Sequence, residues 1–263
     1  MQGQYFEKQG TVYLKNVFSK DELLNFKQNF ESKKDLCNKA YENSDHLILP
    51  IGYNINQDDC INQVLKKLDL PAEKLIGDNW YLTDQGYGPH ADAPKGSIGQ
   101  YLHVVIPIEK SFKEPHTLIV FDQASKIGTL SFTGKLEQTE VAVADENVAK
   151  NIDNQHHRFS DCQKTGVARS EYVTNSTNNQ IDDDFYKRYC DWVYPKNMFW
   201  GLSGKVYPWQ PGDVIMFNSS QIHATGRMPE KTTKLGISML FKLDSSEECD
   251  KFKLNSNYNF ATI

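Results

Sequence analysis

The sequence predicts a mainly-β fold, a sandwich or a barrel, with helices packed on its outside. After Asn79 much of the chain divides into short apolar stretches separated by turns that contain Gly or Pro, as in such folds. The two clearest helical patterns both lie before Pro71. The 263 residues, of which 39% are hydrophobic, suit one large domain with a sizeable core.

The N-terminal part combines one short strand with two helices. Thr11–Val17 reads as a strand, and Ser19 then stands three residues before Glu22, which is the spacing of a capping box. Apolar residues at helical spacing follow, so the sequence predicts a helix from Lys20 to about Lys34. A second helix is predicted over Asp59–Leu68, before Pro71. We expect both helices to support a sheet.

The remaining regular elements are predicted as strands, because they are short apolar or alternating runs between turn residues. They are Leu47–Pro50 (a strand or a loop edge), Asn79–Thr83, Tyr101–Ile108, His116–Asp122, Ile127–Phe132, Val214–Phe217, Ile222–Gly226 and Leu235–Leu243. Successive side chains of a strand point to opposite faces. In the run Tyr101–Ile108, one face is therefore expected to carry Tyr101, His103 and Val105. The other face is expected to carry Leu102, Val104, Ile106 and Ile108.

From Gly134 to Lys205 the pattern weakens and the composition becomes polar, which predicts an insertion or lid between strands. Its run Asp182–Asp184 favours a helix start. His156–Arg158 has two interpretations, a substrate contact or a solvated loop. The expected organisation is a single domain, with 1–78 as N-terminal support, 79–133 and 206–243 as the β core, and 134–205 as the insertion.

Composition narrows the classes of function. A net charge of −5 argues against a broad nucleic-acid footprint. Five scattered cysteines with no C-x-x-C pair argue against a disulfide framework and a structural zinc site. Neither a signal peptide nor a membrane span is visible, so we expect a cytoplasmic protein with reduced thiols.

One stretch carries a metal-binding pattern. Gly86–Pro89 leads into His90 and Asp92, which stand two residues apart and so point to the same face of an extended strand. An imidazole and a carboxylate so placed can reach one ion, and His223 is the best candidate for a third ligand. Two histidines and one carboxylate on one face of a metal form the facial triad of non-haem ferrous oxygenases.

The ordered set of motifs resembles the Fe(II)- and 2-oxoglutarate-dependent oxygenases, of phytanoyl or prolyl-hydroxylase type. The set consists of His90-Ala91-Asp92, the turn and strand Pro211–Phe217, His223, and Lys234 eleven positions beyond that histidine. The resemblance covers about 79–243, with the insertion unmatched. It implies a double-stranded β-helix, or jelly roll, as the core fold.

The resemblance also implies a reaction: hydroxylation of a substrate, coupled to oxidative decarboxylation of 2-oxoglutarate to succinate and CO₂. Ferrous iron, 2-oxoglutarate and O₂ would take part, with ascorbate as an optional reductant. His90, Asp92 and His223 would be the catalytic metal ligands. Lys234 would bind the far carboxylate of 2-oxoglutarate, with Arg227 as the rival cation. The family usually has Arg-x-Ser at this point, whereas this chain has Lys234-Leu235-Gly236 and its serine two places later. This residue, Ser238, is expected on the same strand face as Lys234 and is a candidate to donate a hydroxyl to the co-substrate.

Three further residues are candidates for the cofactor pocket. Tyr101 and His103 share a strand face, and Tyr81 precedes the metal motif on another strand; packing in the core is the competing interpretation for each. The alternative function is a non-catalytic jelly-roll protein that binds a metal or ligand, and a cupin-type dioxygenase would need more histidine ligands. We expect a small-molecule or peptidyl substrate, not nucleic acid, and the sequence leaves the oligomeric state open.

Overall fold

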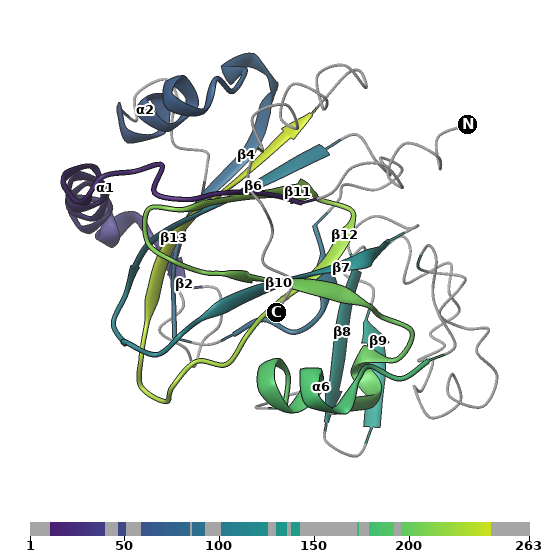
Figure 1. The fold of residues 1–263 in the computed structure, drawn as a ribbon. Coiled ribbons are helices and arrows are strands. Elements are labelled where there is room, and N and C mark those ends of the chain that lie inside the picture. The colour runs from purple at the N-terminus through teal and green to yellow at the C-terminus, as the bar shows by residue number, and fades with distance from the viewer. Residues whose placement is uncertain are drawn as a thin grey trace.

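The computed structural model of the chain describes residues 11–39, 47–50, 59–84, 86–92, 101–125, 130–135, 138–142, 173, 179–191 and 196–242. Within these ranges the protein is mainly β, with two antiparallel sheets and a few helices (Figure 1). Among the described helices, none has the length and apolar character needed to cross a membrane.

Seven described strands form the large sheet. They are β1 (Val12–Leu14), β2 (Asn38–Lys39), β3 (Leu47–Pro50), β4 (Leu75–Thr83), β6 (Tyr101–Lys110), β11 (Val214–Asn218) and β13 (Lys234–Lys242). Their order is β1-β11-β6-β13-β4-β3-β2. The long central strand β13 pairs antiparallel with β6 on one side and β4 on the other.

Six described strands form the small sheet. They are β5 (His90–Ala91), β7 (Thr117–Ala124), β8 (Leu130–Lys135), β9 (Gln138–Ala142), β10 (Gly204–Pro208) and β12 (Gln221–Thr225). Their order is β10-β7-β12-β5-β8-β9. The residue pair His90–His223 joins β5 to β12, which brings segments 133 positions apart side by side.

The topology of the core is a double-stranded β-helix. Successive strands alternate between the two sheets from β4 to β7 and again from β10 to β13. The β8–β9 hairpin between these two runs stays in the small sheet. The two inner four-stranded arrays are β11-β6-β13-β4 and β10-β7-β12-β5. Two facing four-stranded sheets, with eight strands in total, form a jelly roll, so the predicted fold class is confirmed.

Helices cover the outer face of the large sheet. The capping box predicted at the start of α1 (Lys20–Ser32) is present: the Ser19 hydroxyl accepts from the Glu22 amide, and the Glu22 carboxylate accepts from the Ser19 amide. One core cluster joins α1 and α2 (Asp59–Leu68) to this sheet, and it includes Phe26, Phe30, Ile61, Val64, Trp80, Ile106, Ile237 and Phe241. Both helices thus support the sheet, as expected from their apolar faces.

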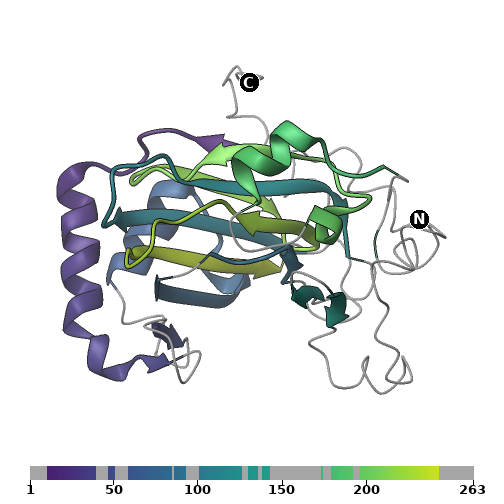
Figure 2. The same ribbon diagram turned by 90° about the horizontal axis from the view of Figure 1, so that it is seen from below.

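The outer face of the small sheet has its own cover. Helix α6 (Asp183–Tyr189) and the 3₁₀ helix η5 (Lys196–Phe199) lie on that side, away from α1 (Figures 1 and 2). Their apolar residues pack with the small sheet in a second cluster that includes Ile119, Phe121, Cys190, Phe199 and Ile222. Parts of the predicted insertion therefore form one layer of the fold. Two shorter 3₁₀ helices, η2 (Lys34–Leu36) and η4 (Ala72–Lys74), complete the described helices.

The turn before β11 ties the N-terminal strand to the core. Gly212 has φ +91°, and a Cβ there would lie 2.7 Å from the Phe18 carbonyl oxygen, so glycine is required. The next residue, Asp213, is buried, and its carboxylate accepts hydrogen bonds from the Tyr13 hydroxyl and the Asn16 amide. The Pro211-Gly212-Asp213 turn therefore has a structural role in this chain, because it holds the N-terminal segment against the core.

Strand limits differ from the predicted ones where pairing extends a weak pattern. Strand β4 begins at Leu75 instead of Asn79, because its first residues pair with β13 although their own sequence lacks alternation. Strand β10 begins at Gly204, inside the predicted insertion, since it pairs with β7. The predicted strand over Thr11–Val17 is shorter, from Val12 to Leu14. His156–Arg158 lies outside the described residues.

Candidate metal centre

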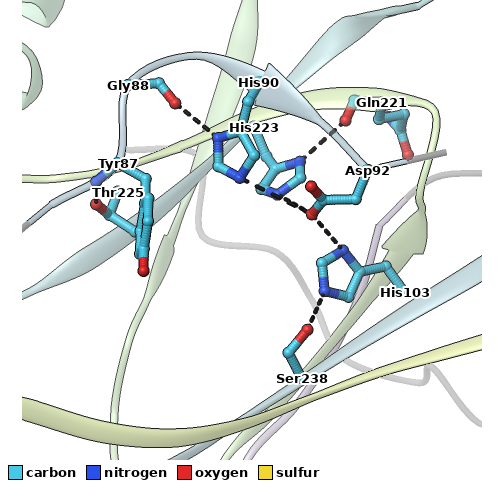
Figure 3. Close-up of polar contacts among 9 residues, drawn as sticks. All are labelled: Tyr87, Gly88, His90, Asp92, His103, Gln221, His223, Thr225 and Ser238. Atoms are coloured by element: carbon cyan, nitrogen blue, oxygen red, sulfur yellow. Dashed lines mark hydrogen bonds and ion pairs between the residues drawn. The ribbon is translucent and has the colours of Figure 1, made fainter. Parts of the chain in front are cut away.

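Three side chains converge between the two sheets (Figure 3). His90 and His223 are direct cross-strand neighbours on β5 and β12, with ring centroids 4.1 Å apart. Asp92 follows β5, and its backbone amide donates to the Ser219 carbonyl at 3.1 Å. One potential ligand atom from each of the three side chains lies within 4.8 Å of the others. The predicted triad is therefore assembled by sheet pairing.

The distances fit one ion. The Oδ2 atom of Asp92 lies 3.8 Å from His90 Nε2 and 3.3 Å from His223 Nε2. Metal bonds of about 2.1 Å at right angles place neighbouring ligand atoms about 3.0 Å apart. Both carboxylate–imidazole distances exceed this spacing by less than an ångström, so the arrangement suits one metal bound on a single face, as in a facial triad.

Backbone carbonyls fix the tautomer of both histidines. His90 Nδ1 lies 2.7 Å from the Gly88 carbonyl oxygen, and His223 Nδ1 lies 3.1 Å from that of Gln221. A carbonyl can only accept, so each Nδ1 carries the proton and each Nε2 presents a lone pair to the site. Such carbonyl partners are typical of metal-binding histidines.

The charge state also suits a divalent cation. Burial lowers the pKa of His90 to about 4, and His223 adds to this effect. Burial alone would raise the pKa of Asp92, but the neighbouring imidazoles, His90 first, outweigh it and hold that pKa well below its usual range. At neutral pH the site therefore offers a neutral imidazole at His90 and an ionised carboxylate at Asp92.

His103 of β6 borders the triad from the large sheet (Figure 3). Its Nε2 lies 2.7 Å from the Ser238 hydroxyl on β13, and its Nδ1 lies 3.6 Å from Asp92 Oδ2. That distance is too long for a hydrogen bond, and Nδ1 is buried without a partner among the described residues. An unpaired buried nitrogen is costly, so its position indicates that a bound group completes the site.

Lys234 is the buried cation of the interior. Its side chain is almost fully buried, its Nζ lies 3.0 Å from His116 Nε2, and it sits 5.4 Å from the centre of the Trp209 ring. Among the described residues no carboxylate lies within 4.0 Å of this ammonium group. Burial lowers the pKa of Lys234 to about 7. A buried ammonium without an anionic partner is unfavourable unless a ligand supplies the negative charge.

Tyr81 occupies the space that a side chain at position 236 would need. A Cβ at Gly236 would lie only 2.5 Å from the Tyr81 hydroxyl oxygen. The Trp209 indole hydrogen bonds to this hydroxyl, and since an indole only donates, the tyrosine keeps its own proton to donate. Tyr81 therefore brings a hydroxyl to the place where the family pattern has the serine of Arg-x-Ser.

The other candidate residues are less directly placed. The Ser238 hydroxyl contacts His103, and Tyr101 is half-buried, with its carbonyl accepting from the Ser219 amide. Arg227 is exposed, and its described contact is the carbonyl that accepts from His116 Nδ1. Sequence reasoning identified neither His116 nor Trp209 as a residue beside Lys234. No local pattern marks either one, because their partners are distant in sequence.

Comparison with known proteins gives structural likeness only. No family model matches the chain, and no curated protein matches it. The chain is similar to the non-haem alpha-ketoglutarate-dependent epimerase SnoN from nogalamycin biosynthesis, with a TM-score of 0.49 and 10% identity over 92% of this chain and 82% of that one.

A Pseudomonas putida prolyl-4-hydroxylase is similar with a TM-score of 0.45 and 11% identity, over 93% of this chain and 100% of the other. HygX from Streptomyces hygroscopicus, solved with nickel and 2-oxoglutarate bound, is similar with a TM-score of 0.44 and 11% identity, over 92% and 86% of the two chains. Likenesses of this size carry no argument about chemistry, which depends on the residues of this chain.

Proposed function

We propose that the protein is an Fe(II)- and 2-oxoglutarate-dependent dioxygenase that hydroxylates a small-molecule or peptidyl substrate. The observation that carries the proposal is the pairing of two features in one interior. Two imidazoles and a carboxylate meet at a point where one ion fits. A buried ammonium, with no carboxylate beside it among the described residues, lies near enough to lower the pKa of His90 by its charge. A metal-chelating dicarboxylate would satisfy both features at once.

The side chains have distinct roles in this proposal. His90, Asp92 and His223 would hold the metal, which when bound supplies the centre where 2-oxoglutarate and O₂ react to give succinate and CO₂. Lys234 would bind the far carboxylate as a point charge. Tyr81 would donate a hydroxyl proton to that carboxylate, because Trp209 already occupies its acceptor side.

Hydroxylation is the outcome that we propose. The resemblance supports it through Asp92, since halogenating relatives lack this carboxylate. His103 has an unpaired Nδ1 directed at the triad, where it would hydrogen bond to an oxygen of the bound co-substrate. Ser238 would act through His103, whose Nε2 it contacts. Tyr101 and Arg227 have no assigned contact with a ligand in this arrangement.

The test is turnover of 2-oxoglutarate by the full chain. The purified protein, loaded with ferrous iron and supplied with O₂ and ascorbate, is expected to convert 2-oxoglutarate to succinate even without its substrate, at a slow uncoupled rate. His90→Ala should stop this conversion. Protein that retains iron but forms no succinate with a broad panel of substrates would favour the alternative, a non-catalytic jelly-roll binding protein.

Binding of 2-oxoglutarate is expected to weaken as the pH rises above 7. The pKa of Lys234 is about 7 in the empty protein, and a bound carboxylate would raise it. Binding above pH 7 therefore requires uptake of a proton, so the affinity should be about tenfold lower at pH 8 than at pH 6. Calorimetry on manganese-loaded protein measures this directly. Pyruvate, which has no far carboxylate, is the control ligand and should show no such loss; an equal loss for both ligands would contradict the role of Lys234.

Gly236→Ser is expected to weaken 2-oxoglutarate binding by about tenfold, although it restores the serine of the family pattern. The new Cβ would lie 2.5 Å from the Tyr81 hydroxyl oxygen and 3.1 Å from the Ile106 carbonyl oxygen, so the tyrosine must move. Loss of one hydrogen bond to a charged group has about this effect. Gly236→Ala introduces the same clash without the hydroxyl, and it should weaken 2-oxoglutarate binding to a similar extent. Tighter 2-oxoglutarate binding by the Gly236→Ser variant would show that the Tyr81 hydroxyl does not take the role of the serine in the family pattern.

A further inference from the structure

His116 is a buried histidine that the proposed reaction does not yet use. It precedes β7, and it is about as buried as His223 of the metal site. Its ring meets those of Phe112 and Trp209 edge-on, each with a centroid distance of 5.7 Å. Its two nitrogens contact two separate segments, Arg227 after β12 and Lys234 at the start of β13.

These contacts determine the protonation of His116. Nδ1 lies 3.0 Å from the Arg227 carbonyl oxygen, which can only accept, so Nδ1 carries the proton. Nε2 is then an acceptor, and the Lys234 ammonium donates to it at 3.0 Å. Burial, followed by the charge of Lys234, lowers the pKa of His116 to about 2. The ring is therefore neutral, and it holds a cation by a hydrogen bond alone.

The arrangement restricts the orientation of Lys234. An ammonium group has three N–H donors, and one of them is directed to His116. The Trp209 ring borders the same group at 5.4 Å. The remaining donors have no carboxylate within reach among the described residues, as noted above. A neutral acceptor beside the ammonium fixes its direction without neutralising its charge, which a carboxylate partner would do.

We propose that His116 is a positioning residue of the co-substrate subsite: it orients Lys234 so that the free N–H donors of the ammonium meet the far carboxylate of the 2-oxo acid. This inference rests on the proposed function and deepens it. A purely structural role is a poor explanation. Among the described residues, the hydrogen-bonding partner of this buried lysine is a neutral histidine, and such an arrangement is less stable than apolar packing of the same volume. The pair is favourable when an anion joins it.

The test compares two substitutions in the full-length, manganese-loaded protein. His116→Phe keeps an aromatic ring against Phe112 and Trp209 but has no acceptor for Lys234. His116→Gln keeps both a donor for the Arg227 carbonyl and an acceptor for the ammonium. The dissociation constants of manganese, 2-oxoglutarate and pyruvate are measured by calorimetry, and steady-state kinetics with iron give KM and kcat for 2-oxoglutarate.

His116→Phe is expected to raise the dissociation constant and the KM for 2-oxoglutarate by about tenfold or more. Pyruvate binding, manganese binding and kcat at saturating 2-oxoglutarate should stay within about threefold of wild type, because the metal centre is intact. His116→Gln should recover most of the affinity for 2-oxoglutarate.

Two results would overturn this role for His116. One is a phenylalanine variant that binds 2-oxoglutarate as tightly as wild type. The other is a parallel loss of 2-oxoglutarate, pyruvate and manganese binding, which indicates a general structural defect. Wild-type protein that binds 2-oxoglutarate no better than pyruvate would instead contradict the proposed function itself, and the inference would fail with it.

Discussion

Asp92→Ala is expected to abolish both metal binding and turnover of 2-oxoglutarate. The Asp92 carboxylate is the only anionic member of the triad, and its Oδ2 atom lies within 4 Å of a nitrogen of each of His90, His103 and His223. Without it a divalent cation would keep two neutral ligands and lose its charge partner. We expect the metal affinity to fall by about a hundredfold or more, and succinate formation to fall below detection. Equilibrium dialysis with ferrous iron and succinate quantification measure the two effects.

Asp184→Ala is the matched control for this variant. Asp184 is an exposed carboxylate in the first turn of α6, outside the described ligand group. Its removal takes away one negative charge, as Asp92→Ala does, and should leave iron binding unchanged. Iron binding by Asp92→Ala at wild-type affinity would show that the triad is not the metal site.

Lys234→Met is expected to remove 2-oxoglutarate binding while it stabilises the empty protein. The substitution replaces a buried ammonium by an apolar chain of similar length next to Trp209 and His116. Lys234 is the only described cation beside Trp209 and His116, so its loss should weaken 2-oxoglutarate binding by about a hundredfold or more. Pyruvate and metal binding should be preserved. Calorimetry with the two ligands measures this difference, and a variant that still prefers 2-oxoglutarate would exclude Lys234 as the anchor.

The stability effect follows from the sign of the pKa shift. The pKa of Lys234 falls from 10.5 to about 7 on folding, so between these values the unfolded chain binds more protons and stability rises with pH. Below pH 7 the cost of burying the charge is fully present. At pH 7 the methionine variant should therefore be more stable in the empty state, by roughly 1–3 kcal/mol. This difference should shrink toward pH 10. Denaturant unfolding at the two pH values measures it, and a destabilised variant at pH 7 would indicate a structural role.

Local sequence patterns predicted much of the fold because the corresponding interactions are local. The Ser19–Glu22 capping box sets the start of α1, and alternation along β6 correctly separates the residues facing the helices, such as Val104 and Ile106, from Val105 on the other face. The spacing of His90 and Asp92 predicted a shared side, and sheet pairing then brings His223 directly opposite.

Long-range contacts account for what the sequence did not reveal. His116 read as the start of a strand, and its pairing with Lys234 spans 118 positions. In the sequence, the glycine at position 236 is a departure from the serine of the family pattern. In the structure, Tyr81 from the neighbouring strand β4 fills the space beside Gly236. Lys234 and His223 are on strands that follow each other in sequence but lie in opposite sheets, so their spacing alone could not place the cation.

The most direct measurement is an anaerobic titration of the iron-loaded protein with 2-oxoglutarate, followed by visible absorption. Bidentate binding of a 2-oxo acid to ferrous iron produces a charge-transfer band. We expect this band to saturate at one equivalent per chain in the wild type, to need far more 2-oxoglutarate in Lys234→Met, and to be absent in His223→Ala. Protein that binds ferrous iron at the triad yet shows no band at any 2-oxoglutarate concentration would contradict the proposed site.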